Sequence, residues 1–465
     1  MKLARQLAQR ITALRYEDLP PEAVYWSKVA VLDTLGVMLA GAVEEPSGIL
    51  EEVLGLQPNS GPSLIVGTAR RAGPLDAALI NGTSAHVLDF DNTATHMGGH
   101  VSAVMVPALL AAGEAFGASG RDVLLAHTAG YEVGARLGRG VNYYHTDKGW
   151  HPTWTLGVFA VTAACARLLN LTPDQTETAL ALATSLAGGT KANFGTMTKP
   201  LHAGQCARNG LLAVLLARRG FTANPEAFEH KQGFFEVFNG KGNYDAARVL
   251  AGWADPLDIV TPGASYKLYP CCYSTHAAIE AALNLVREHG RFNAAAIARV
   301  ESHTAAARLA HTDRPDPNSE LDAKFSVQYC VARALLDGKV VLDHFENNAY
   351  REPTVRNLLQ RVQAITLDEK PKYEGDPFNA RVVVVLADGS TLAASVEYPL
   401  GRTSANPIAP ADLAAKFDNC ALRVLTPQAA RAVSSAIDSL DQLPRVSDLM
   451  GLLVPAARHR ARRAS

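Results

Sequence analysis

Apolar residues recur with helical spacing through the first 260 residues of the chain, and few charges interrupt the faces they form. Pro20-Pro21 precedes one such stretch, which ends at Gly41, as expected of a helix with proline in its first turn. Helices with so little charge on any face bury themselves against one another. The pattern predicts a large all-helical domain. Its expected helices include residues 23–40, 121–137, 153–169, 176–187 and 205–219.

The pattern changes in the second half of the chain, where strand-like alternation is mixed with helical segments. Asp388-Gly389 stands between two alternating stretches, 381–386 and 391–398, which is a strong signal for a β-hairpin. Beyond Pro407 the helical pattern returns. We therefore predict a mainly α protein with two domains. Residues 1–262 and 405–465 form the helical domain, and residues 263–404 form a smaller α+β domain.

Composition narrows the class of protein. The chain has 465 residues, 48% of them hydrophobic and 19% charged, with a formal net charge of -1, so no overall field favours nucleic acid or an anionic membrane. No apolar run reaches the roughly 18 residues that a membrane-spanning helix needs, and no signal peptide is recognisable. The six cysteines lack metal-site or redox spacing, which favours reduced thiols and a cytoplasmic location.

The segment 89–100 concentrates ionisable groups between two apolar runs. It contains Asp89, Asp91, Thr93, His96 and His100, and its paired glycines allow a sharp turn. We interpret it as a loop that moves protons between two buried helices. The alternative is a purely structural loop, because Asp and His also cap helices.

Polar groups also gather at the starts of four other predicted helices. Helix N-termini attract anions, so several of them converging would form a site for a small polycarboxylate. Each residue taken alone is equally compatible with capping or packing. The candidates are His151, Lys199, His202, Lys267, His276 and Tyr329.

Other chemistries have weaker support. The histidines and carboxylates of 89–100 could bind a metal, but the glycine pair argues against a helix there, and H-E-x-x-H is absent, so we predict no metal. Glycine-rich phosphate loops and the G-x-S-x-G elbow are also absent. The glycines of segment 133–140 are expected to end a helix.

Several motifs together resemble the MmgE/PrpD family, which includes 2-methylcitrate dehydratase, cis-aconitate decarboxylase and iminodisuccinate epimerase. The resemblance implies a large helical domain, a smaller α+β lid domain, a homodimer, and no metal or organic cofactor. The matching motifs are Asn81-Gly82, His86-Val87-Leu88-Asp89-Phe90-Asp91, Gly98-Gly99-His100, Trp150-His151-Pro152, Thr198-Lys199-Pro200-Leu201-His202-Ala203-Gly204, Tyr269-Pro270-Cys271-Cys272 with Thr275-His276, and Leu335-Leu336-Asp337-Gly338.

The decarboxylase branch of the family implies specific roles. Its active-site pattern, carried over by motif, falls on Asp89, Thr93, His100, His151, Lys199, His276 and Tyr329. The chain departs from the family pattern at Asp91-Asn92 and at Val101, and its loop is one residue longer than in the animal decarboxylases. These departures leave family membership intact and the substrate open.

The resemblance and the residues together predict a cofactor-independent lyase, a dehydratase or decarboxylase of a citrate- or aconitate-like acid. Lys199 and helix N-termini would hold substrate carboxylates, and histidines would move a proton alpha to a carboxylate. We expect His151 and His276 to be the principal proton donor and acceptor, with Asp89 and Thr93 orienting them. The alternatives are an epimerase that uses the same proton abstraction and a non-catalytic carboxylate-binding protein.

Overall fold

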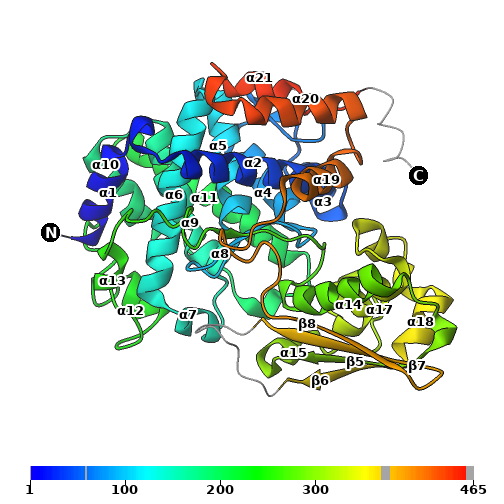
Figure 1. The fold of residues 1–465 in the computed structure, drawn as a ribbon. Coiled ribbons are helices and arrows are strands. Elements are labelled where there is room, and N and C mark those ends of the chain that lie inside the picture. Colours follow the sequence, from blue (N-terminus) through cyan, green and yellow to red (C-terminus); the bar gives the residue numbers. More distant parts are fainter. Residues whose placement is uncertain (1, 58–59, 368–377, 457–465) are drawn as a thin grey trace. The chain divides into compact units, whose positions relative to one another are not determined.

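The computed structural model describes residues 2–57, 60–367 and 378–456, and helices dominate it (Figure 1). The chain divides into two compact units. Unit 1 contains the chain up to Tyr266, Thr403–Ala405 and the stretch from Ala409 onward, and unit 2 contains Lys267–Arg402 and Asn406–Ile408. The predicted class, mainly α with a smaller α+β part, is confirmed.

Unit 1 is built from helices, with short strand pairs at its loops. β1 pairs with β2 and β3 pairs with β4, both in the antiparallel sense. Its elements are α1 (Leu3–Ala13), η1 (Tyr16–Asp18), α2 (Pro21–Gly41), α3 (Glu45–Val53), β1 (Ser63–Leu64), β2 (Arg71–Ala72), α4 (Pro74–His86), β3 (Thr93–Ala94), α5 (Val101–Phe116), α6 (Gly120–Val141), α7 (Tyr144–Asp147), α8 (Pro152–Thr155), α9 (Gly157–Leu168), α10 (Pro173–Ala183), η2 (Lys191–Asn193), α11 (Thr198–Arg218), α12 (Phe234–Phe238), α13 (Ala247–Leu250), β4 (Ala264–Ser265), α19 (Pro410–Ala421), α20 (Pro427–Asp438), η7 (Leu440–Gln442) and α21 (Val446–Gly451).

The core of unit 1 lies among its least charged helices. Every residue of α5 from Val101 to Gly113 is buried, as are most residues of α6 and α9. α2 is the one described helix that is long and apolar enough, by length and composition, to cross a membrane, yet 72% of its most apolar window is buried inside the protein. Its buried polar residues Ser27 and Asp33 bind partners on other segments of the unit. α2 therefore has the packing of a core helix.

Helices α4 and α11 run in opposite directions and meet at two glycines. A Cβ atom added to Gly204 would lie 2.2 Å from the carbonyl oxygen of Leu79, and one added to Gly82 would lie 2.8 Å from the Cα of Gly204. Only glycine at both positions lets the two backbones approach this closely. The crossing fixes the start of α11, which carries Lys199, beside the end of α4.

The glycines of segment 133–140 have a different role from the one predicted. They do not end the helix, because α6 continues to Val141. Gly138 lies inside α6, and a Cβ there would come within 2.1 Å of the carbonyl oxygen of His96, while a Cβ on Gly134 would lie 3.0 Å from the sulfur of Met97. These glycines therefore make room for the 89–100 loop to lie against α6.

Two other predicted boundaries shift. The segment 153–169 is divided into α8 and α9 at Leu156. α11 begins at Thr198 rather than near 205, so Lys199 and His202 belong to its first two turns and do not precede it. Thr172 and Gln175 form a capping box at the start of α10. All six cysteines are buried free thiols.

Unit 2 is a four-stranded sheet in the order β6-β5-β7-β8, and α14 and α17 cover one face (Figure 1). Strands β5 and β6 are parallel, and the other pairs are antiparallel. The hairpin predicted at Asp388-Gly389 joins β7 and β8, with Gly389 at φ +87°. The elements are η3 (Tyr273–Thr275), α14 (His276–His289), η4 (Ala294–Ala296), β5 (Ile297–Thr304), α15 (Ala306–Thr312), α16 (Glu320–Lys324), α17 (Val327–Asp337), η5 (Leu342–Phe345), η6 (Ala349–Arg351), α18 (Pro353–Leu359), β6 (Val362–Thr366), β7 (Ala380–Leu386) and β8 (Thr391–Val396).

Replacing Gly204 by Ala tests the close crossing of α4 and α11. The new methyl group would meet the backbone oxygen of Leu79, which cannot rotate away, so we expect a loss of about 1–3 kcal/mol in the free energy of unfolding. Chemical denaturation measures it. Gly48→Ala in α3 is the control, because nothing lies within 4 Å of its added Cβ. Equal stability of the two variants would contradict the crossing.

Candidate active site

The loop between α4 and α5 is bent into an unusual conformation at the point where it carries its ionisable groups. Asp89 adopts a left-handed backbone conformation with φ +52°, which residues other than glycine rarely adopt. Thr93 lies in β3, paired with Ser265, and Gly98 turns the chain at φ +66°. His100 is the residue immediately before α5. The strained Asp89 is held by tertiary contacts, and such strain is common at functional sites.

Asp91 lies at the centre of this loop, fully buried, between two imidazoles. Nδ1 of His86 lies 3.1 Å from Oδ1 and 3.0 Å from Oδ2 of Asp91, and Nδ1 of His100 lies 2.8 Å from Oδ2. The ring centroids of the two histidines are 4.4 Å apart, edge to face. An ionised carboxylate can only accept hydrogen bonds. Nδ1 of His86 is hydrogen-bonded to it, whereas Nδ1 of His100 makes a close polar contact without the alignment of a hydrogen bond.

Asp89 points to a cation from another helix. Its Oδ1 accepts a hydrogen bond from Nζ of Lys199 at 2.6 Å, and Nε2 of His100 lies 4.0 Å from the same oxygen. Lys199 is in the first turn of α11, where unpaired backbone N–H groups add positive potential. The ammonium group is thus fixed beside His100 by residues that are far apart in the sequence.

Two more imidazoles extend the cluster. Nδ1 of His151, just before α8, lies 3.0 Å from Nδ1 of His202 in α11, so one donates and the other accepts. The ring of His151 is stacked 5.8 Å from His86, and Phe194 packs edge-on against His151 at 4.8 Å. Phe194 also lies 5.4 Å from Nζ of Lys199. The cluster therefore joins the starts of α5, α8 and α11.

Burial sets the protonation of most of these groups. It lowers the pKa of His86 and of His202 to about 4, and it lowers the pKa of His151 well below its usual value, helped by the positive charges around them. Burial alone would raise the pKa of Asp91, but the adjacent imidazoles of His100 and His86 hold it well below the ordinary value. Asp91 is therefore ionised at neutral pH, whereas His86, His151 and His202 are neutral.

Exposure separates the cluster into two layers. The side chains of His100, Lys199 and Asp89 are 13%, 11% and 9% exposed, whereas those of His86 and Asp91 have no exposed surface. A bound molecule can reach the first three. The other two act only through the groups they touch.

His96, which the sequence placed among the ionisable groups of the loop, has a structural role. Its Nδ1 lies 2.5 Å from Oδ1 of the buried Asp258, which also forms ion pairs with Arg136 and Arg139 of α6. Backbone N–H of Asp258 donates to Glu132 at 2.7 Å. This network ties the loop and the segment around 258 to α6.

The ligand atoms of His86, Asp89, Asp91 and His100 lie within 4.8 Å of one another, a spacing that could hold a metal ion. However, the charges of this set already have partners: Lys199 pairs with Asp89, and two imidazoles flank Asp91. A divalent ion would have to displace Lys199 and compete with both Nδ1 protons. The arrangement therefore suits proton transfer better than metal coordination.

The base of the loop is anchored by a buried ion pair. Nζ of Lys416 in α19 lies 2.5 Å from Oδ1 of Asp33 in α2 and donates a hydrogen bond to the carbonyl oxygen of Phe90 at 2.8 Å. The side chain of Asn92 donates to Oδ2 of Asp33 at 3.0 Å. Phe90 and Asn92 flank Asp91, so this pair fixes the backbone on both sides of the central carboxylate.

The remaining predicted residues belong to unit 2. His276 is the first residue of α14 and is buried, stacked 4.6 Å from Tyr273. The hydroxyl of Tyr329 donates to the carbonyl oxygen of His344 and accepts from Nε of Arg333 at 2.9 Å, and burial raises its pKa to about 12. Lys267 is buried. The roles of Lys267, His276 and Tyr329 in the reaction stay predictions.

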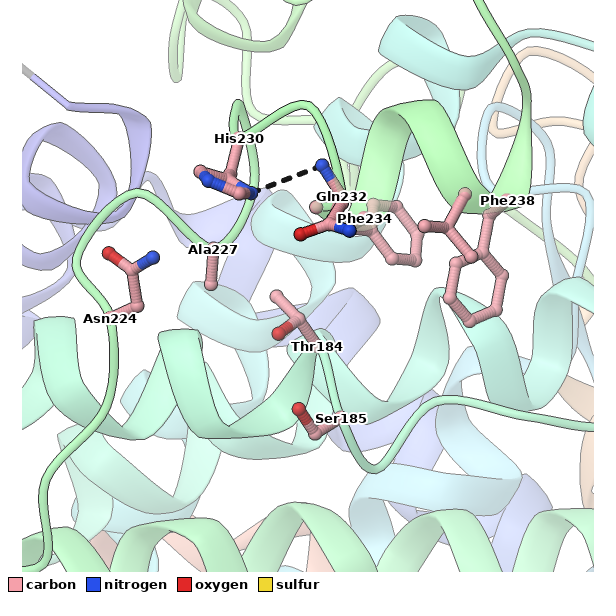
Figure 2. A pocket seen from close by; sticks show the side chains of 10 residues that line it. Thr184, Ser185, Asn224, Ala227, His230, Gln232, Phe234 and Phe238 are labelled. Carbon is pink, nitrogen blue, oxygen red and sulfur yellow. Dashed lines mark hydrogen bonds between the residues drawn. The ribbon is translucent and has the colours of Figure 1, made fainter.

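A separate pocket of about 260 Å³ lies beyond the end of α10 (Figure 2). His230 at its rim accepts a hydrogen bond from the backbone N–H of Gln232 at 3.1 Å, and Phe234 and Phe238 supply apolar surface. No lysine or arginine lines it among the described residues, so it is poorly suited to a polycarboxylate. Its lining residues are Thr184, Ser185, Asn224, Ala227, His230, Gln232, Gly233, Phe234, Val237 and Phe238.

Sequence reasoning did not assign roles to Asp91, His86 or Phe194. His86 and Asp91 both lie in the family motif, and their closeness in the sequence was the available signal, because they flank Asp89 within six residues. Phe194 had no signal in the sequence. Its contact with His151 depends on the fold of the segment before α11.

Breaking the anchor should destabilise the protein strongly. Lys416→Met leaves the buried carboxylate of Asp33 without its cation, and we expect a loss of about 3–5 kcal/mol in the free energy of unfolding, measured by chemical denaturation. Adding Asp33→Asn should recover part of the loss. Arg445→Ala is the control, because its pair with Asp448 is exposed and should contribute no more than about 1 kcal/mol. If Lys416→Met and Arg445→Ala lost similar amounts of unfolding free energy, the stabilising role of the pair between Lys416 and Asp33 would be refuted.

Stability should fall in mild acid. Burial lowers the pKa of His86, His127, His145 and His202 to about 4 in the folded state, so between pH 6.5 and 4 the unfolded chain binds more protons and stability decreases as pH falls. Each group contributes about 1 kcal/mol between pH 7 and 5.5. Urea unfolding across this range should show a shallower dependence for His127→Gln. A flat wild-type profile would contradict the assignment.

Comparison with known proteins agrees with the motifs. Residues 5–247 match the MmgE/PrpD N-terminal domain, and residues 269–442 match the MmgE/PrpD C-terminal domain. The chain is 30% identical over 466 residues to a cis-aconitate decarboxylase of Homo sapiens, covering 97% of this chain and 94% of that protein. It is 29% identical over 465 residues to one of Aspergillus terreus, covering 95% and 93%. A 2-methylcitrate dehydratase of Cupriavidus necator is 28% identical over 309 residues, covering 61% and 60%. The chain belongs to the MmgE/PrpD family.

Proposed function

We propose that the chain is a lyase that decarboxylates cis-aconitate or a closely similar tricarboxylate, without a metal or organic cofactor. Its relatives named cis-aconitate decarboxylase cover nearly its whole length, whereas those named 2-methylcitrate dehydratase cover about three fifths of it. These relatives support a lyase of one of the two types. Decarboxylation is the better supported because the likeness includes both units.

The proposed reaction needs little covalent chemistry from the protein. In an acid with a C=C bond beta,gamma to a carboxylate, the C–C bond to that carboxylate breaks and carbon dioxide leaves. The electron pair forms a new C=C bond, and the former double bond shifts its pair to a carbon alpha to another carboxylate. That carbon takes one proton. The protein must hold the retained carboxylates, stabilise the carbanion-like charge and supply the proton.

Lys199 and the helix starts around it suit the first task. The ammonium group has a fixed position beside Asp89 and partial exposure, and the N-terminus of α11 adds N–H groups on the same side. A substrate carboxylate can share this ammonium group. Phe194 gives the neighbouring surface an apolar ring, which disfavours water beside the carboxylate that leaves as neutral carbon dioxide.

His100 suits the third task, the supply of the proton, better than the other imidazoles of unit 1. The observation that carries this choice is its combination of partial exposure with Asp91 at 2.8 Å, because the buried carboxylate holds the ring from one side and leaves Nε2 toward the exposed atoms of Asp89 and Lys199. His151 and His202 are neutral and share one hydrogen bond. We therefore assign Nε2 of His100 as the proton donor, in place of the pair His151 and His276 expected from the sequence.

The activity test compares cis-aconitate, citrate and 2-methylcitrate with the purified protein in D2O, followed by NMR. We expect release of carbon dioxide from cis-aconitate and one deuterium alpha to a carboxylate in the product. His100→Asn retains a donor toward Asp91 but lacks Nε2, so kcat should fall by roughly 10²–10⁴-fold. Lys199→Met should raise KM by about tenfold or more, because it removes a charge that binds the carboxylate. His289→Gln is the histidine control.

Other outcomes point to other functions. A new conjugated C=C bond without carbon dioxide would indicate a dehydratase, and deuterium exchange with an unchanged skeleton would indicate an epimerase. Thermal stabilisation by the acids without turnover would indicate a binding protein. Full activity of His100→Asn on the true substrate would reject the proton-donor assignment.

A further inference from the structure

Asp91 and His86 form a pair that cannot touch a substrate yet contacts the proposed proton donor. Neither side chain has any exposed surface, and both lie directly against His100. From the elements packed around it, His100 also faces Asp89 and the positive charge of Lys199, and it acts electrostatically on His151. Among these groups Asp91 alone lies at hydrogen-bond distance from a ring nitrogen of His100.

We infer that Asp91 and His86 are positioning residues for His100. Asp91 keeps the proton of His100 on Nδ1, so Nε2 is the atom that exchanges a proton with the substrate. His86 is the second donor to the same carboxylate and keeps it oriented and ionised. The inference rests on the proposed function for its kinetic consequence, but the tautomer it assigns does not.

The geometry assigns the tautomer. Nδ1 of His100 lies 2.8 Å from Oδ2 of Asp91, although the two groups are not aligned as a hydrogen bond. A nitrogen lone pair this close to a carboxylate oxygen would be repelled, so we place the proton of His100 on Nδ1. The free position, Nε2, is then directed to the side where Asp89 and Lys199 have exposed atoms. If the ring of His100 rotated away from Asp91, Nε2 would no longer point toward Asp89 and Lys199.

His86 must stay neutral for the arrangement to work. One carboxylate carries one negative charge, and two imidazolium rings 4.4 Å apart would repel each other. His86 is the more buried of the two, and its Nε2 has no hydrogen-bond partner within the part of the chain that the structure describes. A buried neutral ring tolerates this better than a charged one, so the charge of Asp91 remains available to His100.

The chain offers conservative replacements that separate these roles. An asparagine side chain at position 86 places an N–H donor close to where Nδ1 of histidine lies, whereas leucine fills a similar volume without a donor. Asp91→Asn retains the shape of Asp91 but removes its charge. Asp33→Asn is a matched control, because Asp33 is a buried carboxylate that anchors the same loop through Asn92 without facing His100.

The direct test is long-range ¹H–¹⁵N NMR of histidine-labelled full-length protein at neutral pH. For wild type we expect both His86 and His100 to carry a hydrogen-bonded proton on Nδ1 with a downfield resonance. Asp91→Asn should lose both resonances, and His86→Leu should lose its own. Asp33→Asn should retain both while lowering the melting temperature. A His100 ring protonated on Nε2 alone, or unchanged resonances in Asp91→Asn, would overturn the inference whatever the activity.

The kinetic test uses the same variants on the substrate that wild type turns over. Asp91→Asn should lower kcat by roughly 10²–10⁴-fold with a change in KM below about threefold, as expected when a buried acid that orients a histidine is lost. His86→Leu should lower kcat about tenfold, and His86→Asn should restore it to within about threefold of wild type.

If Asp91→Asn does not fold, the comparison of His86→Leu with His86→Asn still decides the question. Equal activity of these two variants would refute the role of His86 as a donor. If wild type turns over none of the acids, the proposed function fails, while the NMR assignment stands or falls separately.

Discussion

A charge removed from water must have a partner, and this constraint shapes the whole candidate site. Asp89, Asp91 and Asp258 and the anchoring Asp33 are all buried, and each has a cation or an imidazole within 3.2 Å. The partners come from segments far away in the sequence, including α6, α11 and α19. Removing Lys199 or Lys416 would leave the carboxylate of Asp89 or Asp33 uncompensated in a helical core, which costs several kcal/mol. The pairs therefore fix the loop in one conformation, including the left-handed backbone of Asp89.

Small residues make this pairing geometrically possible. Gly82 and Gly204 bring α4 and α11 so close that Lys199 reaches Asp89, and Gly138 lets the loop lie against α6. Glycine lowers helix stability by about 0.5–1 kcal/mol relative to alanine. At these positions the helices are therefore locally less stable, but the neighbouring backbones can approach each other closely. The ion pairs and the close crossings support each other, because each requires the backbone position that the other fixes.

Much of this could be predicted from the sequence, and the reasons for the failures are physical. Helix periodicity located α2 and α10, and Asp388-Gly389 located the hairpin, because these signals are local. The concentration of ionisable groups in 89–100 identified the loop. The ion pairs between distant residues could not be predicted. His96 contacts Asp258, which is 162 residues away, and Lys416 forms an ion pair with Asp33. The glycines of α6 were misread as a helix end, because a close approach by a distant loop leaves no local trace.

The proposed chemistry also follows from the charge balance of the inner cluster. Around His100 the cluster holds two carboxylates, Asp89 and Asp91, and one ammonium group, Lys199, while the buried imidazoles of His86 and His151 are neutral. A polycarboxylate entering such a site would meet a net negative charge. The ligand can offset this charge by sharing the ammonium group of Lys199 with Asp89. Its carboxylate is then held beside Nε2 of His100, so the interaction that admits the anion also places it next to the proposed proton donor.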